Sequence, residues 1–306
     1  MNLFWAIGLK LISTLLFAIM SALVRLMGDV SPVGEIVFFR GLFGILPVLV
    51  VYAWRGQIAA AVYTRAPFGQ LLRGLISTVG MFANFGALVR IPLAEVTAIS
   101  FASPLMVVAL AAMILKEKVR VYRWSAVAVG FVGVIVMLIP NLDVRQYTAA
   151  TAAAATGALL ALVSSFTNSA AVIQTRRLVK TESTASIVFY FSLVTAIGGA
   201  LTLPFVWCTP AWVDFIALAS IGVLGGLSHI LLTESYRHAS ASVIAPFDYT
   251  SMLWALLLGY WIFGEVPTIL VLLGAGIVVI AGLFVIWRER QLGLARAREV
   301  EPTTPA

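Results

Sequence analysis

Ten long apolar segments determine what this chain can fold into. Each contains the roughly 20 mainly apolar residues that a helix needs to cross a membrane. The segments cover residues 4–27, 33–54, 67–89, 93–115, 121–139, 151–175, 183–207, 211–233, 241–263 and 267–287. Of the 306 residues, 61% are hydrophobic and 11% are charged, whereas a soluble globular chain is about half apolar and about a quarter charged. The sequence therefore predicts an all-α integral membrane protein with ten transmembrane helices, surrounded by membrane lipid.

Basic residues gather on one side of these predicted helices. They occupy the connections after the second, fourth, sixth and eighth segments and the polar tail 288–306. These residues are Arg55, Arg65, Lys116, Lys118, Arg120, Arg123, Arg176, Arg177, Lys180, Arg237, Arg288, Arg290, Arg296 and Arg298, against Arg25, Arg90 and Arg145 in the opposite connections. Cytoplasmic loops carry the excess of Lys and Arg, so both termini are predicted in the cytoplasm, as in a bacterial-type inner-membrane protein. The same distribution accounts for the net charge of +7 without a nucleic-acid partner.

Several classes of function lack their sequence signatures. One cysteine and two histidines are too few for a disulfide framework or for a zinc, iron–sulfur or His-rich metal site. No cofactor or hydrolase motif of the Walker, His-Glu-x-x-His or Gly-x-Ser-x-Gly type is found. Ser228 and His229 are adjacent, so on a helix they point about 100° apart, which is poor geometry for a nucleophile and its base. An intramembrane enzyme is therefore disfavoured, and a receptor that does not transport stays open as an alternative.

The two halves of the chain look related. A shift of 148 positions brings several residues of 1–139 onto similar residues of 151–287. The matched pairs include Phe101 with Tyr249, Ser103 with Ser251 and Glu117 with Glu265. Because each half has five predicted segments, the second half enters the membrane from the opposite face. The sequence therefore predicts a 5+5 inverted repeat followed by the tail 288–306, and such repeats place the binding site at their interface near the membrane midplane.

Four short strings resemble a known family. They are Glu35 to Arg40, Leu72 to Gly74, Pro92 to Glu95 and Leu115 to Glu117. Together they resemble the EamA-type carriers of the drug/metabolite transporter superfamily, and within it most the S-adenosylmethionine carrier group. The resemblance implies a secondary active transporter that moves a small organic metabolite by alternating access, without ATP hydrolysis. An S-adenosylmethionine-like or other amphipathic or zwitterionic solute is implied, with an exporter of amino acids or drugs or a riboflavin carrier as alternatives.

Ionisable residues inside the predicted helices are the first candidates for a binding site, because charge in the hydrocarbon is costly. Arg40 lies about 10 Å into the second segment at 1.5 Å per residue. Its guanidinium is suited to binding a solute carboxylate bidentately, with a structural pair to Glu35 as the alternative. Asp248 is a candidate for a cationic solute group, a proton or Na⁺, unless it pairs with a basic residue such as Arg73. His229 is either a proton relay or a hydrogen-bonded packing residue.

Aromatic and small polar residues complete the predicted site. Phe101 and Tyr249 are expected to stack on a ring of the solute, while Arg40 and Asp248 hold its opposite charges. The remaining candidates are Ser77, Met81, Asn84, Ser100 and Asn168. Aromatic faces with a few polar groups suit amphipathic ligands, although Ser and Asn also bridge packed membrane helices. The two halves are expected to rock around this pocket, and the coupling ion (a proton or sodium) and a homodimeric state stay open.

Overall fold

The computed structural model describes residues 3–54, 56, 58–114, 121–142, 149–179, 181–238 and 245–300. These residues form helices and turns and no strands. The helices are α1 (Leu3–Met27), α2 (Val33–Trp54), α3 (Ile58–Val62), α4 (Pro67–Leu88), α5 (Leu93–Ser100), α6 (Ala102–Ile114), α7 (Val121–Leu138), α8 (Ala149–Leu178), α9 (Thr184–Ala200), α10 (Leu203–Val206), α11 (Trp212–His238), α13 (Thr250–Phe263) and α14 (Ile269–Val300), with 3₁₀ turns η1 (Ile139–Leu142) and η2 (Ala245–Tyr249). The predicted all-α class is confirmed.

Eight helical stretches are long and apolar enough to cross a membrane. They are Phe4–Met27, Val33–Trp54, Pro67–Leu88, Leu93–Ile114, Thr151–Thr175, Ala185–Phe205, Trp212–Ser235 and Ile269–Arg288. Each corresponds to one of the ten predicted segments. A shorter apolar helix, Trp124–Leu138, lies in the predicted segment 121–139. In the predicted segment 241–263, residues 241–244 lie outside the described part, and η2 and α13 form the remainder. The count of ten and the cytoplasmic termini remain predictions.

Two predicted segments differ from the helices that form. The segment 93–115 is divided into α5 and α6 at Phe101. Proline has no N–H, so Pro104 leaves the Ser100 carbonyl without its partner four residues later, which explains the break. At the other end of the chain, α14 continues to Val300 through the first part of the predicted polar tail, because its Arg, Glu, Gln, Leu and Ala residues are good helix formers. Residues 115–120 and 301–306, with the predicted repeat position Glu117, lie outside the described residues.

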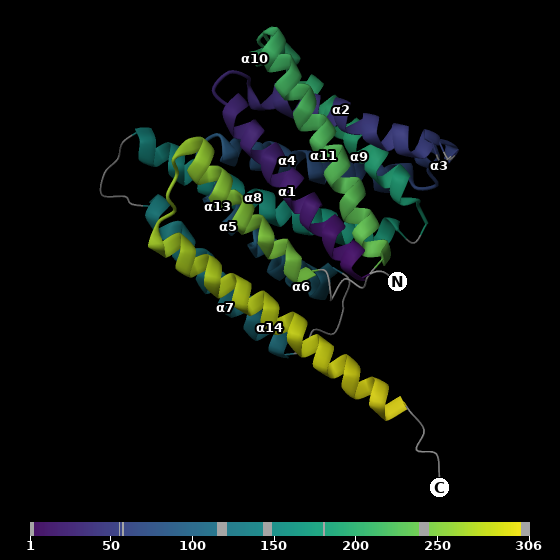
Figure 1. Ribbon diagram of the computed structural model, residues 1–306, viewed down its shortest axis with the longest axis vertical. Coiled ribbons are helices and arrows are strands. Elements are labelled where there is room, and N and C mark those ends of the chain that lie inside the picture. The colour runs from purple at the N-terminus through teal and green to yellow at the C-terminus, as the bar shows by residue number, and fades with distance from the viewer. Residues whose placement is uncertain are drawn as a thin grey trace.

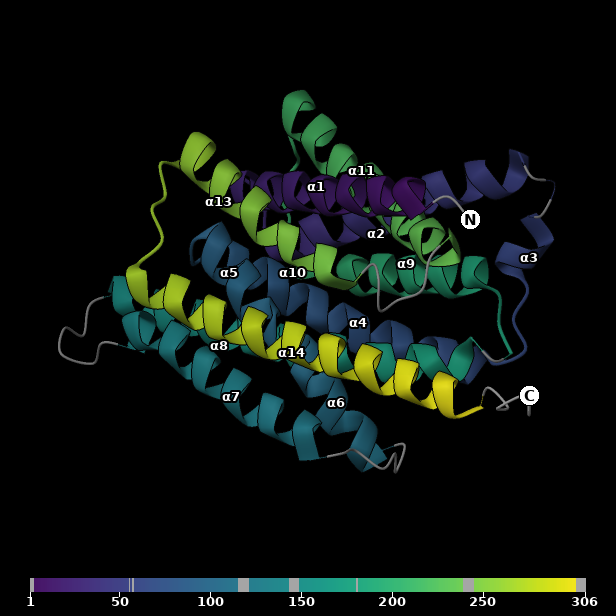
Figure 2. The same ribbon diagram turned by 60° about the horizontal axis from the view of Figure 1, so that its bottom comes forward.

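The helices form one main bundle with a helix pair at its side (Figures 1 and 2). Within the bundle, α1 packs against α11, α2 against α9 and α11, and α4 against α8 and α9. The pair consists of α7 and α14, which lie side by side in both views. Their backbones approach closely at Gly133 and Gly274, where a Cβ atom on either residue would clash with the carbonyl oxygen of the other. Small residues allow membrane helices this kind of contact.

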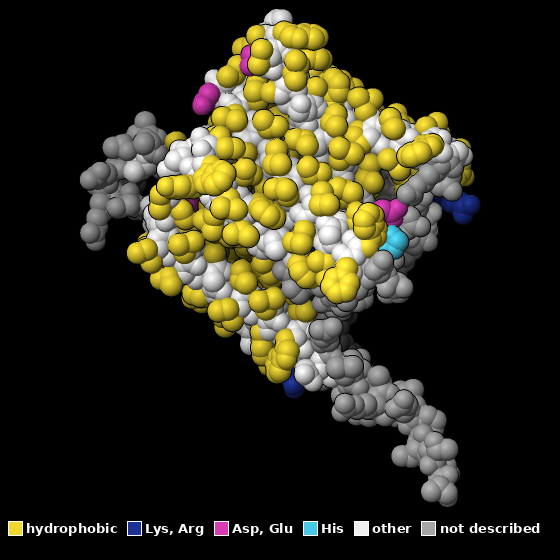
Figure 3. Space-filling model, viewed as in Figure 1, with side chains coloured by type: hydrophobic (Ala, Val, Ile, Leu, Met, Phe, Trp, Pro, Cys, Tyr) yellow, Lys and Arg dark blue, Asp and Glu magenta, His cyan; other side chains and the backbone are white. Residues whose placement is uncertain are grey.

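The outer surface suits a lipid environment. Hydrophobic side chains cover most of the face drawn in Figure 3, and the charged side chains visible there lie near its margins. Exposed aromatic residues include Trp5, Trp54, Phe68, Trp212 and Trp261. Large apolar side chains on such a surface are stable in contact with lipid tails, whereas in water they would promote aggregation.

Candidate functional site

One face of α1 carries polar residues along most of the helix. Lys10, Thr14, Ala18, Ser21 and Arg25 follow one another at intervals of three or four residues. This spacing places them on the same side of an α-helix. The face therefore presents a charged residue near each end and small or hydroxyl side chains between them.

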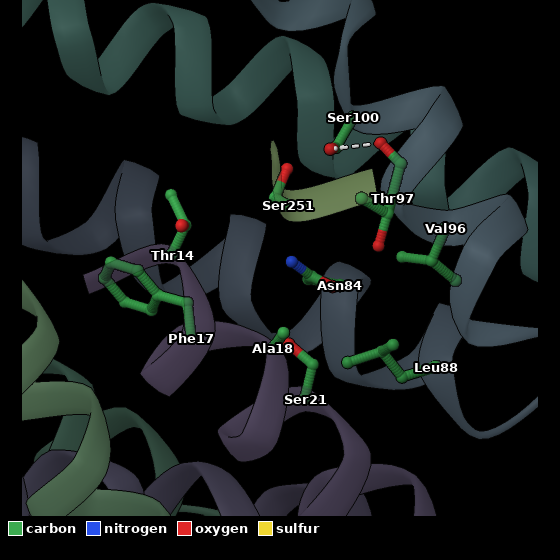
Figure 4. A pocket seen from close by; sticks show the side chains of 10 residues that line it. All are labelled: Thr14, Phe17, Ala18, Ser21, Asn84, Leu88, Val96, Thr97, Ser100 and Ser251. Carbon is green, nitrogen blue, oxygen red and sulfur yellow. Dashed lines mark hydrogen bonds between the residues drawn. The ribbon is translucent and has the colours of Figure 1, made fainter. Parts of the chain in front are cut away.

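A cavity of about 150 Å³ lies against the middle of this face. Its walls come from α1, α4, α5 and α13 (Figure 4). The lining residues are Thr14, Phe17, Ala18, Ser21, Asn84, Leu88, Val96, Thr97, Ser100 and Ser251. Figure 4 shows the Asn84 side chain between the α1 residues and the α5 residues. The hydroxyls of Thr14, Thr97, Ser100 and Ser251 each donate a hydrogen bond to a nearby backbone carbonyl. Ser21 and Asn84 are therefore the polar lining residues best placed to donate to a ligand.

Near one end of the cavity, α1 is joined to η2 by an ion pair. Lys10 Nζ lies 2.5 Å from Asp248 Oδ1. The Lys10 side chain is 1% exposed, whereas that of Asp248 is 49% exposed. The Thr14 and Thr250 hydroxyls lie 3.1 Å apart, and the Trp254 indole donates to Thr14 Oγ1 (3.3 Å). These contacts hold α1 and α13 together beside the cavity.

At the other end of the same α1 face, a second ion pair joins Arg25 to Glu265. Arg25 also donates to the carbonyl of Leu88 (2.8 Å) and to that of Ile91. Glu265 accepts a hydrogen bond from the Leu93 amide (3.0 Å). Leu88 lines the cavity. This network therefore closes the end of the cavity with residues of α1, of the α4–α5 connection and with Glu265, which lies two positions after α13.

A basic cluster with one buried and two partly buried residues lies beside the cavity, around the ring of Phe191 in α9. The Arg40 guanidinium carbon is 5.6 Å from the ring centroid and that of Arg73 is 5.1 Å away. His229 contacts the same ring edge-on at 5.8 Å, and it contacts Phe17 of the cavity wall at 5.0 Å. We call Arg40, Arg73 and His229 the basic cluster. Phe17 and His229 connect it to the cavity.

The two arginines of the cluster are held differently. Arg73 donates from Nε to the Thr175 hydroxyl (2.8 Å) and from Nη1 to the Ile187 carbonyl (3.2 Å). Arg40 is 2% exposed, and its Nε has no hydrogen-bond acceptor among the described residues. Within the described part of the chain, ion pairs are formed by Asp248 and Glu265 and not by an acid beside either arginine. Arg40 therefore carries a buried positive charge that neither of these carboxylates compensates.

The predicted site residues fall into separate groups in the structure. Asn84 and Ser100 line the cavity. Glu35 is fully buried in the first turn of α2, and no ion pair joins it to Arg40. Both of its carboxylate oxygens are buried without a hydrogen-bond partner among the described residues. Asp248 pairs with Lys10 and not with Arg73.

Other predicted residues take part in helix packing. Phe101 and Tyr249 contact each other edge-on (5.1 Å) within a core formed with α7 and α14, and they do not line the cavity. Asn168 donates to Ser103 Oγ (3.0 Å). Ser77 and Met81 are partly buried in α4 between the level of Arg73 and that of Asn84.

Several residues of the site were not predicted. The α1 side chains Thr14, Phe17 and Ser21, the α5 residue Thr97, and Phe191 in the basic cluster are of ordinary types for a membrane helix. For the α1 residues, the one sequence signal is their spacing between Lys10 and Arg25, which follows a single helix face. Thr97 and Phe191 have no such signal.

Comparison with known proteins identifies the family. The family model that matches, described as the EamA-like transporter family, covers residues 4–139 and 155–288. The chain belongs to this family. With eight helices of membrane-spanning length and composition, it is a multi-pass membrane protein, and its bacterial relatives agree with the predicted inner-membrane location.

The relatives include named transporters. The chain is 30% identical to the S-adenosylmethionine uptake transporter of Rickettsia bellii, over 84% of each chain. It is 28% identical to the pseudopaline exporter CntI of Pseudomonas aeruginosa, over 89% of this chain and 93% of that protein. A crystal structure with 17% identity has a TM-score of 0.65 over 94% of this chain and 98% of its own, so the two share a fold. The resemblance to the S-adenosylmethionine carriers is thus confirmed.

Proposed function

We propose that this protein is a secondary transporter that carries a small zwitterionic or amphipathic metabolite, of the S-adenosylmethionine type, by alternating access between its two halves. One observation carries the proposal: a partly polar cavity lies between α1, α4 and α5 of the first half and α13 of the second, with an ion pair near each end. A solute held there contacts both halves. A rocking motion that breaks one end at a time would expose it to alternate sides of the membrane.

The size of the cavity supports a conformational change in the cycle. Pockets for drug-sized ligands measure roughly 300–1,000 Å³, and the cavity here is about 150 Å³. A metabolite as large as a nucleoside derivative therefore requires α1 and α13 to separate further. The conformation described here corresponds, in this proposal, to a closed state with both ends tied.

The charges on either side of the cavity suit a solute with two opposite charges. In the proposal, the basic cluster attracts a carboxylate, since Arg40 is buried without a described acidic partner, and Asp248 attracts a cationic group. Phe17 supplies an aromatic face at the cavity. Phe101 and Tyr249 contact each other instead, so the stacking role falls to Phe17.

The named relatives suggest which solutes to test. One relative is an uptake transporter for S-adenosylmethionine and another is an exporter of pseudopaline, so both directions of transport occur among similar proteins. We propose S-adenosylmethionine as the first substrate to examine, with riboflavin and aromatic amino acids as comparison compounds. Coupling to a proton or sodium gradient belongs to the same proposal.

The test is uptake of labelled S-adenosylmethionine into proteoliposomes that contain the purified protein, with and without a proton or sodium gradient. We expect saturable uptake by the wild type and none by Arg40→Gln. Arg90→Gln is a matched control, because Arg90 is an arginine whose described hydrogen bond goes to the Gly86 carbonyl of its own helix end (2.7 Å). Binding without flux in either direction would favour a receptor instead. Loss of flux in Arg90→Gln as well would remove the special role of Arg40.

A further inference from the structure

We infer that the Lys10–Asp248 pair is an exchangeable cation site at one end of the cavity, where a sulfonium or ammonium group of the solute displaces Lys10 from Asp248. The inference rests on the proposed function and specifies how that site recognises positive charge. In the conformation described here, the Lys10 ammonium occupies the position that the solute's cationic group takes when the site is loaded.

The position of the pair supports this assignment. Lys10 precedes the cavity residue Thr14 by four positions on α1, and Asp248 precedes the cavity residue Ser251 by three positions. Residues at these spacings lie one helical turn apart on the same face. The carboxylate is therefore about one turn from the cavity lining, where the hydroxyl of the lining residue Thr14 lies 3.1 Å from that of Thr250.

The burial of the two side chains is unequal, which makes the pair suited to exchange. Lys10 is 1% exposed and Asp248 is 49% exposed, so an arriving cation reaches the carboxylate without first entering the core. Lys10 has a long, flexible stem. It lies about 10 Å along the helix axis from Leu3 at 1.5 Å per residue, so its ammonium is able to withdraw toward the end of the helix and the membrane interface.

The chemistry of the site favours an organic cation. Asp248 supplies one carboxylate, and the neighbouring groups are threonine and serine hydroxyls. An ammonium or sulfonium group needs one nearby negative charge and no fixed coordination geometry. A divalent metal ion would need several more anionic or carbonyl oxygens, and no group of three or more His, Cys, Asp or Glu residues occurs in the part of the chain that the structure describes.

The experiment compares the binding of two ligands that differ in one positive charge. S-adenosylmethionine has a sulfonium, and S-adenosylhomocysteine has a neutral thioether in the same place. Equilibrium binding of each to the purified full-length protein in detergent is measured for the wild type, Asp248→Asn, Lys10→Gln and the control Glu265→Gln. Glu265 belongs to the other ion pair, so its change tests for a general effect of breaking a link between α1 and the second half.

We expect the wild type to prefer the sulfonium compound by about tenfold or more, which is typical of a hydrogen bond or contact that involves a charged group. Asp248→Asn should bring this ratio close to one. Lys10→Gln should keep the preference and bind the sulfonium compound more tightly than the wild type, because the resident competitor is gone. Glu265→Gln should leave the ratio unchanged. The double variant Lys10→Gln/Asp248→Asn, which removes both charges of the pair, should have the same ratio as Asp248→Asn. If both variants still bind the neutral thioether compound as the wild type does, the lost ratio is not due to unfolding.

Three results would overturn the inference. They are an unchanged ratio in Asp248→Asn, weaker sulfonium binding in Lys10→Gln, and a ratio that depends on sodium instead of on the sulfonium charge. Binding with the expected ratios but without flux in proteoliposomes would reject the proposed transport and keep the cation site. Absence of binding by either compound to the wild type would reject both this site and the proposed substrate type.

Discussion

The α1 helix forms an ion pair near each of its ends with the segment that contains α13, and the two pairs are built differently. In the Lys10–Asp248 pair, the ammonium is buried and the carboxylate is half-exposed. In the Arg25–Glu265 pair, the side chains are 20% and 12% exposed. Arg25 also bonds two carbonyls, and Glu265 also accepts a backbone amide.

Two ion pairs of similar composition therefore have different roles. The Arg25 network satisfies backbone groups at the α4–α5 connection, so breaking it exposes several polar groups to an apolar environment at once. In the Lys10–Asp248 pair, the carboxylate is already half-exposed. We therefore expect the Arg25 end to be the more stable closure of the cavity and the Lys10 end to open more easily when a solute arrives.

The largest expected effect comes from breaking the Arg25 network. Removing one partner of a buried, hydrogen-bonded ion pair costs about 3 kcal/mol or more of folding free energy. Glu265→Ala should therefore lower the thermal unfolding midpoint in detergent markedly. Asp29→Ala, which removes an exposed carboxylate after α1, is the control and should change little. Equal midpoints for Glu265→Ala and the control would show that the network does not stabilise the fold.

Exchanging the two charges within each pair tests whether its contribution to stability depends on hydrogen bonds to the backbone. In Arg25→Glu/Glu265→Arg, a carboxylate at position 25 accepts hydrogen bonds and cannot donate to the Leu88 and Ile91 carbonyls. The double variant should stay about 2 kcal/mol less stable than the wild type, since each unsatisfied buried group costs about 1–3 kcal/mol. In Lys10→Asp/Asp248→Lys, the ion pair re-forms with one partner at the half-exposed position 248, so the free energy of unfolding should stay within about 1 kcal/mol of that of the wild type. Full recovery by the Arg25 exchange would contradict the distinction.

Unlike the residues of the two ion pairs, Arg40 has no ionic partner among the described residues. Because an uncompensated buried charge is destabilising, Arg40→Gln should not lower the unfolding midpoint, despite the loss of a cation–π contact worth about 1 kcal/mol. Uptake should nevertheless be abolished. The midpoint and the uptake are measured on the same preparation. A clear drop in the midpoint would assign Arg40 a structural role in place of the proposed ligand role.

Much of the fold is predictable from the sequence because the lipid environment imposes simple rules. A helix that crosses the membrane needs a long apolar run, so eight spans coincide with predicted segments. Local backbone breaks were harder to predict. The division at Phe101 depends on one missing N–H at Pro104, and hydropathy is insensitive to that detail. The continuation of α14 beyond residue 287 reflects helix propensity in a polar stretch, where the hydropathy signal ends.

The site was less predictable, because burial and partners depend on which helices meet. Arg40 and Asp248 stand out in sequence as charges within apolar segments, but the pairing of Asp248 with Lys10 arises between residues 238 positions apart. Phe101 and Tyr249 are equivalent in the predicted repeat, and the structure places them against each other. Thr14 and Ser21 carry no signal beyond their shared helix face.

A smaller effect is expected where these two aromatic residues meet. An edge-on aromatic pair contributes about 0.5–1.5 kcal/mol beyond its buried area, so Phe101→Leu should lower the unfolding midpoint slightly. Substrate affinity should be unchanged, because Phe101 does not line the cavity. Phe17→Leu, at the cavity wall, is the matched comparison and should weaken binding. A loss of affinity in Phe101→Leu alone would restore the predicted stacking role of Phe101.

The smallest effect concerns a third link between the halves, outside the membrane-spanning segments. Glu182, before α9, accepts hydrogen bonds from the backbone amides of Arg65 (2.7 Å) and Ala66 (2.8 Å) at the start of α4. Partial burial acts to raise the pKa of Glu182, but these hydrogen bonds, with those from Thr64 and Gln70, outweigh it and lower the pKa below its usual value of 4.5.

A carboxylate whose pKa is lowered by folding stabilises the fold above its unfolded-state pKa, and this stabilisation is lost as the pH falls through the lower folded-state value. Glu182→Gln should therefore unfold at a slightly lower temperature than the wild type near neutral pH, and the two midpoints should converge below pH 4.5. The measurement is thermal unfolding in detergent at a series of pH values. Because Glu182 bonds backbone amides as Glu265 does, a difference that persists at low pH would show that the carboxylate charge is not what holds α4 to the α8–α9 connection.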